Sequence, residues 1–368
     1  MKIVFRMILA VVLSVGGVTA MAAAPAAAAY ATPGYVLTST TASLPSELSA
    51  VATGKKISYV TTSITGATIT ATGLVLTPKT GKNNKIVAWG HGTTGLADGC
   101  APSTNQAVFW AEARIAVAEL ISRGWTVTAP DYPGLGTPQA HPYLIGNSEA
   151  RSLIDGVKAA RNLDSSLGVN YAIDGHSQGG QGSLFANQLA PSYDGNLVLK
   201  GTAAIAPVSN ADVISPLIPG SEANGYLVMA MFGIAAVDSS FNPLTVLAAP
   251  AEAKLSVLAT GCLNEILAAY ADLSDTELVE GGTLPDSLLT KLATYDNPAQ
   301  TAPSAPILVV QGTEDEAVPY FVTADLLIPQ LEAYSQPVDF VVIDGASHDE
   351  AVIQSADLVA DWIAARFA

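Results

Sequence analysis

The sequence predicts an α/β protein in which a mostly parallel central sheet has helices on both faces. Short β-branched or apolar runs alternate with segments of helical periodicity along most of the 368 residues. Hydrophobic residues make up 49% of the chain, which is enough for a large buried core. Residues 211–303 contain no convincing strand, so we expect them to form a helical cap inserted over the carboxyl edge of the sheet.

The individual elements follow in order along the chain. Residues 31–54 are rich in Ser, Thr, Ala and Pro and predict an irregular leader, whereas β-branched runs at 57–62 and 67–76 predict an antiparallel hairpin. Further strands are predicted at 85–89, 125–129, 171–174, 201–206, 306–311 and 338–343. Helices are predicted at 108–121, after a cap at Asn147 or Ser148, at 227–232, 244–258 and 263–270, and at the carboxyl end, where Val352, Ala356, Val359 and Ile363 share one face.

The amino-terminal segment is expected to be removed before the protein reaches its final compartment. Lys2 and Arg6 precede an apolar run over 7–18, and small residues follow up to Ala29. This order is typical of a secretory signal peptide, and the apolar run is shorter than the ~20 residues that span a bilayer. We expect cleavage near Ala29 and an extracellular or periplasmic domain over 30–368; a retained anchor is the alternative.

One pentapeptide indicates the chemistry. Gly175-His176-Ser177-Gln178-Gly179 lies between the predicted strand 171–174 and a predicted helix that contains 183–186. Gly-x-Ser-x-Gly at a strand-to-helix turn is the nucleophile elbow of the α/β-hydrolase fold, in which a strained turn lifts the serine hydroxyl above the sheet. Because the pentapeptide also occurs by chance, the assignment of Ser177 depends on its partners.

A serine hydroxyl is a good nucleophile only when a base, usually a histidine, takes its proton. In this fold the acid and then the histidine follow the serine along the chain. Of the four histidines, only His348 follows Ser177 with room for an acid between them; the others are His91, His141 and His176. His348 also lies between the last predicted strand and helix, at the sheet edge where ligands bind in open α/β sheets.

The acid is expected to follow the strand before that one. Asp315 comes after the predicted strand 306–311 and is our choice. Glu314 and Glu316 are adjacent rivals that the sequence does not exclude. Asp344 and Asp349 are too near His348 in sequence to be the partner from a separate loop.

An acyl-transfer site also needs two hydrogen-bond donors for the oxyanion of its tetrahedral intermediate. The backbone N–H of Gln178, directly after the nucleophile, is expected to be one of them. The other is expected from the glycine-rich loop at 90–95. We assign it to the amide of Thr93, with Gly92 the near alternative.

Charge and cysteine content narrow the range of partners. The formal net charge is −16, and becomes −18 without Lys2 and Arg6, so nucleic acid and anionic membranes are poor partners. Cys100 and Cys262 are the only cysteines, and an exported protein is expected to join them in a disulfide; two buried thiols are the alternative. No Cys/His spacing suggests a metal site.

Two further loops contain candidate pocket residues. Asp131 and Tyr132 follow the predicted strand 125–129. We expect a structural role for Asp131 and have no preference between pocket and core for Tyr132. His141 and Tyr143 lie in a proline-flanked loop, where solvent exposure is the plainer expectation and a place at the pocket entrance the alternative.

Four motifs together resemble the secretory lipase family, which comprises fungal lipases of the lipase A type and bacterial relatives. They are Gly90-His91-Gly92-Thr93-Thr94-Gly95, Cys100-Ala101-Pro102-Ser103, Pro130-Asp131-Tyr132-Pro133-Gly134-Leu135-Gly136 and Gly175-His176-Ser177-Gln178-Gly179-Gly180. The resemblance covers the chain from about Lys85 onward. It implies a Ser-Asp-His triad at Ser177, Asp315 and His348, a helical cap, and cleavage of carboxylic esters, often triacylglycerols.

Motif order and resemblance together predict a secreted serine carboxylester hydrolase (lipase or esterase) that works through an acyl-enzyme and needs no cofactor. Its substrate is expected to be a small-molecule, lipid or polyester ester. Fungal members carry a flap after the histidine, whereas this chain ends with one helix, so esterase and polyester hydrolase are equally open. An acyltransferase with the same triad, and an inactive binding protein on a hydrolase scaffold, are the alternatives.

Overall fold

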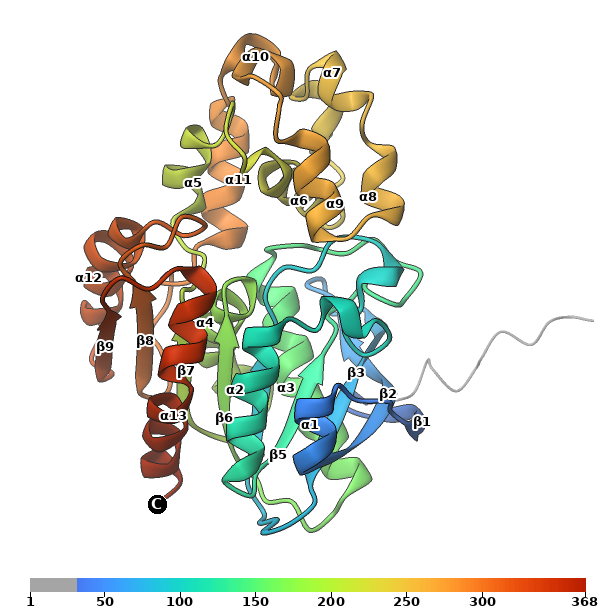
Figure 1. Ribbon diagram of the computed structural model, residues 1–368, viewed down its shortest axis with the longest axis vertical. Coiled ribbons are helices and arrows are strands. Elements are labelled where there is room, and N and C mark those ends of the chain that lie inside the picture. The colour runs from blue at the N-terminus through green and yellow to red at the C-terminus, as the bar shows by residue number, and fades with distance from the viewer. Residues whose placement is uncertain (1–31) are drawn as a thin grey trace, which may run out of the picture. The chain divides into compact units, whose positions relative to one another are not determined.

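A nine-stranded mixed sheet organises residues 32–368, the part of the chain that the computed structural model describes (Figure 1). The expected signal peptide lies outside these residues. The strand order is β1-β2-β3-β5-β4-β6-β7-β8-β9. The strands are β1 (Val36–Thr41), β2 (Ala52–Thr62), β3 (Thr68–Pro78), β4 (Ile86–Gly90), β5 (Thr126–Pro130), β6 (Asn170–His176), β7 (Val198–Ile205), β8 (Ile307–Gly312) and β9 (Val338–Ile343).

The type of strand pairing changes once across the sheet, at β5. β1, β2, β3 and β5 pair antiparallel in turn, and every pair from β5 to β9 is parallel. The predicted hairpin is therefore confirmed as β2 and β3, each longer than its apolar run. The carboxyl ends of the parallel strands meet at one edge of the sheet, so the loops that follow β4, β6, β8 and β9 are neighbours.

Helices cover both faces, and alternation along the strands decides which side chains they meet. In β4, Val87 and Trp89 belong to the core that also contains α2 (Ala111–Ser122) and α13 (His348–Phe367). Ile86 and Ala88 belong to the core on the other face, which also contains α3 (Gly146–Leu163) and α4 (Gln178–Tyr193). Both faces of β4 are apolar, as parallel strands buried on two sides require.

Two sequence predictions near the amino-terminal side of the fold are wrong. The expected irregular leader contains β1 and a short helix, α1 (Ser46–Val51). β1 is an edge strand whose last four residues are exposed, so it carries no alternation of apolar residues that the sequence could reveal. Helix α3 begins after Ile145 without a side-chain cap, rather than at Asn147 or Ser148.

Seven α-helices lie between β7 and β8, where the structure has no named strand. They are α5 (Ala211–Ile214), α6 (Asn224–Ala235), α7 (Ala249–Glu252), α8 (Ser256–Thr260), α9 (Leu263–Tyr270), α10 (Asp275–Leu278) and α11 (Asp286–Asp296). We call residues 211–303 the helical segment; Figure 1 shows its helices together, beyond one end of the strands. It has its own apolar core, which includes Met229, Ile234 and Tyr270. The predicted helix at 244–258 is wrong because proline starts a new turn at Pro243 and again at Pro250.

A disulfide connects the helical segment to the loop after β4. Cys100 and Cys262 are bonded, with their Cα atoms 5.5 Å apart, which confirms the predicted pairing. Beside the bond, Gly95 and Cys262 form an isolated β-bridge, and the Leu263 amide donates to the carbonyl of Thr94 at 2.8 Å. The amino end of α9 is therefore fixed to this loop by covalent and hydrogen bonds.

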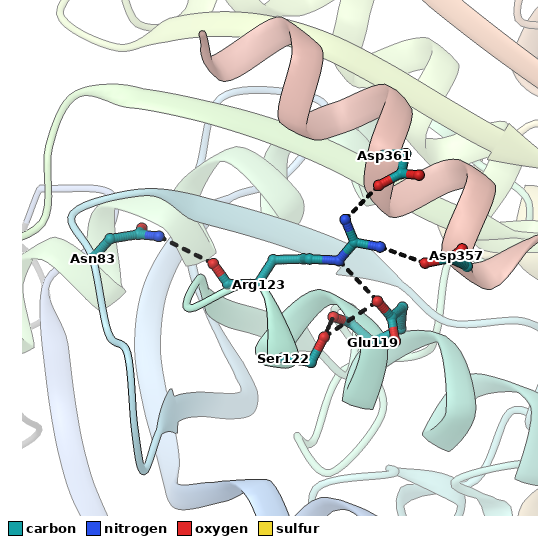
Figure 2. A network of polar contacts seen from close by, with 6 residues as sticks. All are labelled: Asn83, Glu119, Ser122, Arg123, Asp357 and Asp361. Carbon is teal, nitrogen blue, oxygen red and sulfur yellow. Dashed lines mark hydrogen bonds and ion pairs between the residues drawn. The ribbon is translucent and has the colours of Figure 1, made fainter.

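A single arginine connects the end of helix α2 to helix α13 (Figure 2). Arg123, directly after α2, donates from Nε to Glu119 at 2.8 Å and forms short ion pairs with Asp357 and Asp361 of α13. Its carbonyl accepts from the Asn83 side chain at 3.2 Å. Isolated exposed ion pairs contribute little, but one guanidinium shared by three carboxylates holds α13 in register with α2. This matters because α13 begins at His348.

The described residues contain no helix long and apolar enough to cross a bilayer.

Candidate active site

Ser177 occupies the turn between β6 and α4 in a conformation that non-glycine residues rarely adopt. Its φ is +56° and its ψ is −118°. The surrounding backbone imposes this geometry: the Ser177 amide donates to the Ile205 carbonyl at 2.9 Å, and its own carbonyl accepts from Gln181 at 3.0 Å. Strained residues of this kind persist only where neighbours over-determine them, and they cluster at functional sites. The turn has the form expected of a nucleophile elbow.

Glycines allow the backbones around Ser177 to approach closely. A Cβ atom on Gly179 would lie 2.0 Å from the carbonyl oxygen of Gly90 in β4. One on Gly175 would lie 2.3 Å from the Gly179 carbonyl oxygen. Any side chain at either position would push α4 away from the sheet and move Ser177 with it.

His348 and Asp315 are in direct contact. The Nδ1–H group of His348 donates to Oδ2 of Asp315 at 2.7 Å. Asp315 lies in the loop after β8 and is 6% exposed, and its Oδ1 accepts from the amides of Ala317 and Val318 at 2.9 and 2.8 Å. Gln311 Nε2 donates to Oδ2 at 2.8 Å, so four donor atoms in all fix the carboxylate in one orientation. His348 has no other carboxylate partner among residues 32–368.

The start of α13 holds His348 in place. Ser347 and Glu350 form a capping box, in which the Ser347 amide donates to the Glu350 carboxylate at 3.0 Å. Because Nδ1 carries the proton shared with Asp315, the lone pair of His348 is on Nε2. Ser177 and His348 line the same cavity of about 360 Å³. The structure thus brings Ser177, Asp315 and His348, from three distant segments, to one edge of the sheet.

A second histidine lies against the first. The rings of His176 and His348 have centroids 4.4 Å apart. Burial, and then the neighbouring His348, lower the pKa of His176 well below its ordinary range. His176 is therefore neutral at pH 7, and it places no second positive charge beside His348.

The loop after β4 brings Thr93 to the same cavity as Ser177. Its hydroxyl shares a hydrogen bond of 2.8 Å with the Tyr143 hydroxyl, and its carbonyl accepts from the Trp110 indole at 3.0 Å. No acceptor among residues 32–368 binds the Thr93 amide. Gln178 is the first residue of α4, where amides have no partner within the helix. Both expected oxyanion donors are thus held in place with their N–H groups free.

The side chain of Gln178 is anchored below the helix. Its Nε2 donates to Oε1 of Glu149 at 2.7 Å and to Nε2 of His141 at 3.3 Å. His141 Nδ1 donates to the Pro133 carbonyl at 2.8 Å, so its Nε2 is free to accept. Burial lowers the pKa of His141 to about 4 and raises the pKa of Glu149 to about 8. The imidazole of His141 and the carboxyl of Glu149 are therefore neutral at pH 7, like the amide of Gln178 that lies between them.

Sequence reasoning missed part of this arrangement. The expected exposure of His141 and Tyr143 is wrong: they are 3% and 2% exposed. Tyr143 lines an apolar cavity that reaches Ser177, which agrees with the alternative of a place at the pocket, whereas His141 lines neither of the two cavities that reach Ser177. Glu149 is not among the residues predicted for the site. One signal in the sequence points to its burial: it lies four residues before Leu153, on the same buried face of α3. Asp131 has the structural role expected of it, since it accepts from the Ser103 amide at 2.8 Å.

Tyr132 is fully buried and is a core residue rather than a pocket residue. Its hydroxyl donates to the His91 carbonyl at 3.1 Å, and its ring packs on the His91 ring.

A second cavity of about 290 Å³ also reaches Ser177. Its walls are mainly apolar and come largely from the helical segment; they include Leu144, Val208, Leu217, Leu227, Ala230 and Leu292. The cavity that contains His348 is more polar and includes the carboxyl groups of Glu112 and Asp349. Burial and then Asp349 raise the pKa of Glu112 to about 7. Ser177 therefore lines both an apolar and a polar cavity.

Solved structures share this architecture. Lipase A of Candida antarctica in its closed state superposes with a TM-score of 0.79 at 20% identity, covering 93% of this chain and 84% of that one. A rice cell wall degrading esterase of Xanthomonas oryzae gives a TM-score of 0.74 at 21% identity, covering 91% of this chain and 100% of that one. These likenesses confirm the predicted α/β-hydrolase fold.

Sequence relatives are fungal. A secreted triacylglycerol lipase of Malassezia globosa is 28% identical over 285 residues, 71% of this chain and 59% of that protein. A second from the same fungus is 27% identical over 273 residues, 67% of this chain and 57% of that protein. The chain thus spans less than two thirds of these relatives. The model of the secretory lipase family matches residues 102–368, which include every residue of the proposed triad. The chain belongs to the secretory lipase family.

Proposed function

We propose that the protein is a secreted carboxylester hydrolase with Ser177 as nucleophile, His348 as base and Asp315 as its partner. One observation carries the proposal: the 2.7 Å contact between His348 and Asp315 at the same cavity as a serine held in a strained elbow. Membership of the secretory lipase family supports the ester substrate. The fungal relatives, named secreted triacylglycerol lipases, support secretion.

The reaction begins when His348 Nε2 takes the hydroxyl proton of Ser177 as Oγ attacks the ester carbonyl carbon. Asp315 keeps the imidazole in the tautomer that accepts this proton and stabilises the imidazolium that forms. The imidazolium then gives the proton to the departing alkoxide oxygen, and the C–O bond to the alcohol breaks. In the second half, His348 takes a proton from water as the water oxygen attacks the acyl carbon. The imidazolium then returns this proton to Ser177 Oγ as the bond between the acyl carbon and Oγ breaks and the acid is released.

Charge builds up on the carbonyl oxygen in both tetrahedral intermediates. The amides of Gln178 and Thr93 are assigned to bind it, with Gly92 the alternative to Thr93. One such donor contributes about 2.7–4 kcal/mol to the transition state in a comparable site. The bonds that fix Thr93 and Gln178 hold these donors before the substrate arrives.

The two cavities suggest how an ester lies across Ser177. We assign the acyl chain to the apolar cavity and the alcohol to the polar one, where His348 can protonate the leaving group. In this arrangement the helical segment acts as a cap whose side chains, among them Leu227 and Ala230, form the acyl wall. An acyl pocket with this lining fits a hydrocarbon chain.

The proposal is tested with Ser177→Ala and, as a matched control, Ser192→Ala, an exposed serine at the far end of α4. Ser177→Ala is expected to abolish hydrolysis of a p-nitrophenyl ester and labelling by a fluorophosphonate, with an unchanged circular dichroism spectrum. Ser192→Ala should retain both activities. Labelling that persists in Ser177→Ala would place the nucleophile elsewhere, and an unlabelled wild-type protein would indicate an inactive scaffold.

A further inference from the structure

Three potential metal ligands meet beside the proposed triad. Glu112 projects from α2, His176 ends β6 and Asp349 is the second residue of α13. Each offers one ligand atom, and these three atoms lie within 4.8 Å of one another. All three residues line the polar cavity that contains Ser177 and His348. Because they come from three distant segments, no spacing in the sequence could reveal them.

These side chains lack the partners that buried charged groups normally have. Glu112 is 6% exposed, yet its carboxylate forms no hydrogen bond or ion pair with another residue of 32–368, and its own backbone amide is its one donor there. Nε2 of the 3% exposed His176 is equally unpartnered. The nearby Arg114 donates instead to the carbonyl oxygens of Phe109 and Gln106, at 2.6 Å each. Burying a carboxylate costs free energy unless the group is paired with another polar group or coordinates a metal.

We propose that Glu112, His176 and Asp349 form a binding site for a divalent transition-metal ion, with Zn²⁺ the best match. Carboxylate oxygens and imidazole nitrogens are both zinc ligands, and a site with three protein ligands leaves the fourth position open to water. Tetrahedral ligand atoms around zinc lie about 3.4 Å apart, given bonds of about 2.0–2.1 Å. Asp349 is exposed, so its side chain is free to make the small movement that closes the set.

Metal binding at this place has a consequence for the reaction, and this part rests on the proposed function. The His176 ring lies against His348, so an ion bound to His176 adds positive charge next to the imidazole that must become an imidazolium. The ion also fills part of the cavity assigned to the leaving alcohol. Occupancy therefore inhibits ester hydrolysis, and removal of the ion restores it.

The first experiment measures binding without reference to catalysis. Chelator-treated protein and its Ser177→Ala variant are titrated with ZnCl₂ by calorimetry, and Co²⁺ is added separately to record its visible absorption. We expect one saturable Zn²⁺ per chain in both proteins and a Co²⁺ spectrum that includes nitrogen coordination. Affinity should fall at least about tenfold in Glu112→Gln and in Asp349→Asn. Glu332→Gln, an exposed acid on α12 (Ile328–Glu332), is the control and should bind like wild type.

The second experiment measures hydrolysis of a p-nitrophenyl ester with and without Zn²⁺, each variant being compared with its own metal-free rate. We expect saturating Zn²⁺ to lower the wild-type rate at least about fivefold, reversibly with EDTA, and to change the Glu112→Gln rate less than twofold. No saturable binding, or equal binding in Glu112→Gln, Asp349→Asn and wild type, would overturn the site. Binding that leaves the wild-type rate unchanged would overturn the inhibition. Failure of the proposed function would show instead as an unreactive Ser177 with Zn²⁺ binding intact.

Discussion

The side-chain amide of Gln178 donates a 2.7 Å hydrogen bond to the fully buried carboxyl of Glu149, and so connects the residue after the proposed nucleophile to helix α3. The same amide reaches His141 on its other side. A backbone N–H that must bind an oxyanion works best when its own residue cannot turn. Glu149 is therefore a positioning residue, which acts on the reaction through Gln178.

Glu149→Leu should lower kcat about tenfold with little change in KM, because the oxyanion donor loses its anchor while the substrate cavities are untouched. A tenfold change corresponds to about 1.4 kcal/mol of transition-state stabilisation. Glu149→Gln keeps an acceptor for Gln178 and should restore most of the rate. Steady-state kinetics on one ester check both variants, and a matched rise in KM for Glu149→Leu would argue for general disruption instead.

Stability should fall as the pH rises from about 7 to 9. Below this range the buried histidines, whose pKa values are lowered by burial, act in the opposite direction, because they gain protons only in the unfolded chain. Burial raises the pKa of Glu149 and of Asp174 to about 8, so the folded protein keeps protons that the unfolded chain has lost above pH ~4.5. The folded state then binds more protons than the unfolded state, and the free energy of unfolding decreases with pH until both groups ionise in the folded state. Thermal melting across this range measures the slope. Glu149→Gln should give a flatter profile, and a wild-type melting temperature that rises from pH 7 to 9 would contradict the assignment.

Loss of the Cys100–Cys262 bond should destabilise the protein by about 3–5 kcal/mol, because the bond closes a long loop in the unfolded chain. The double variant Cys100→Ala/Cys262→Ala tests this by urea denaturation. Dithiothreitol should lower the stability of wild type to that of the variant and leave the variant unchanged. Equal stability of oxidised wild type and variant would show that the bond contributes nothing to the fold.

Ala230 lies on α6 and lines the apolar cavity, so Ala230→Phe should shorten the acyl chain that fits. The ratio of kcat/KM for an octanoate over an acetate ester is expected to fall by roughly 10- to 200-fold, or about 1–3 kcal/mol. Acetate hydrolysis by the same variant is the internal control. Equal losses on both esters would mean that the cavity does not hold the acyl chain.

Sequence reasoning predicted the segments that carry Ser177, Asp315 and His348, which the structure brings to one edge of the sheet, because each depends on local order: a strand, a turn, and the chain order typical of the fold. It reached the parallel strands because both of their faces are apolar. It failed where the signal is not local. The exposed strand β1 has no apolar pattern, and the burial of His141 depends on Pro133 and Gln178, which meet it only in the folded chain.

The meeting of Glu112, His176 and Asp349 is a further case of this kind. Each residue alone has an ordinary explanation: Glu112 is an acid on a helix, His176 is next to Ser177 in the strand-to-helix turn, and Asp349 is an acid at the start of a helix. Only the sheet topology, which puts the ends of β6 and β9 at one edge, brings them together with α2.

The bond between Cys100 and Cys262 also restricts how the site can open. The amino end of α9 is tied to the strand-like stretch that carries Thr94 and Gly95, directly after the proposed oxyanion donor Thr93. An outward movement of α9 would move the Thr93 amide away from Ser177 and abolish the proposed ester hydrolysis. Any widening of the cavity for a bulky ester must therefore come from movement of helices far from the disulfide. The proposed catalytic residues then keep their positions while the cavity changes size.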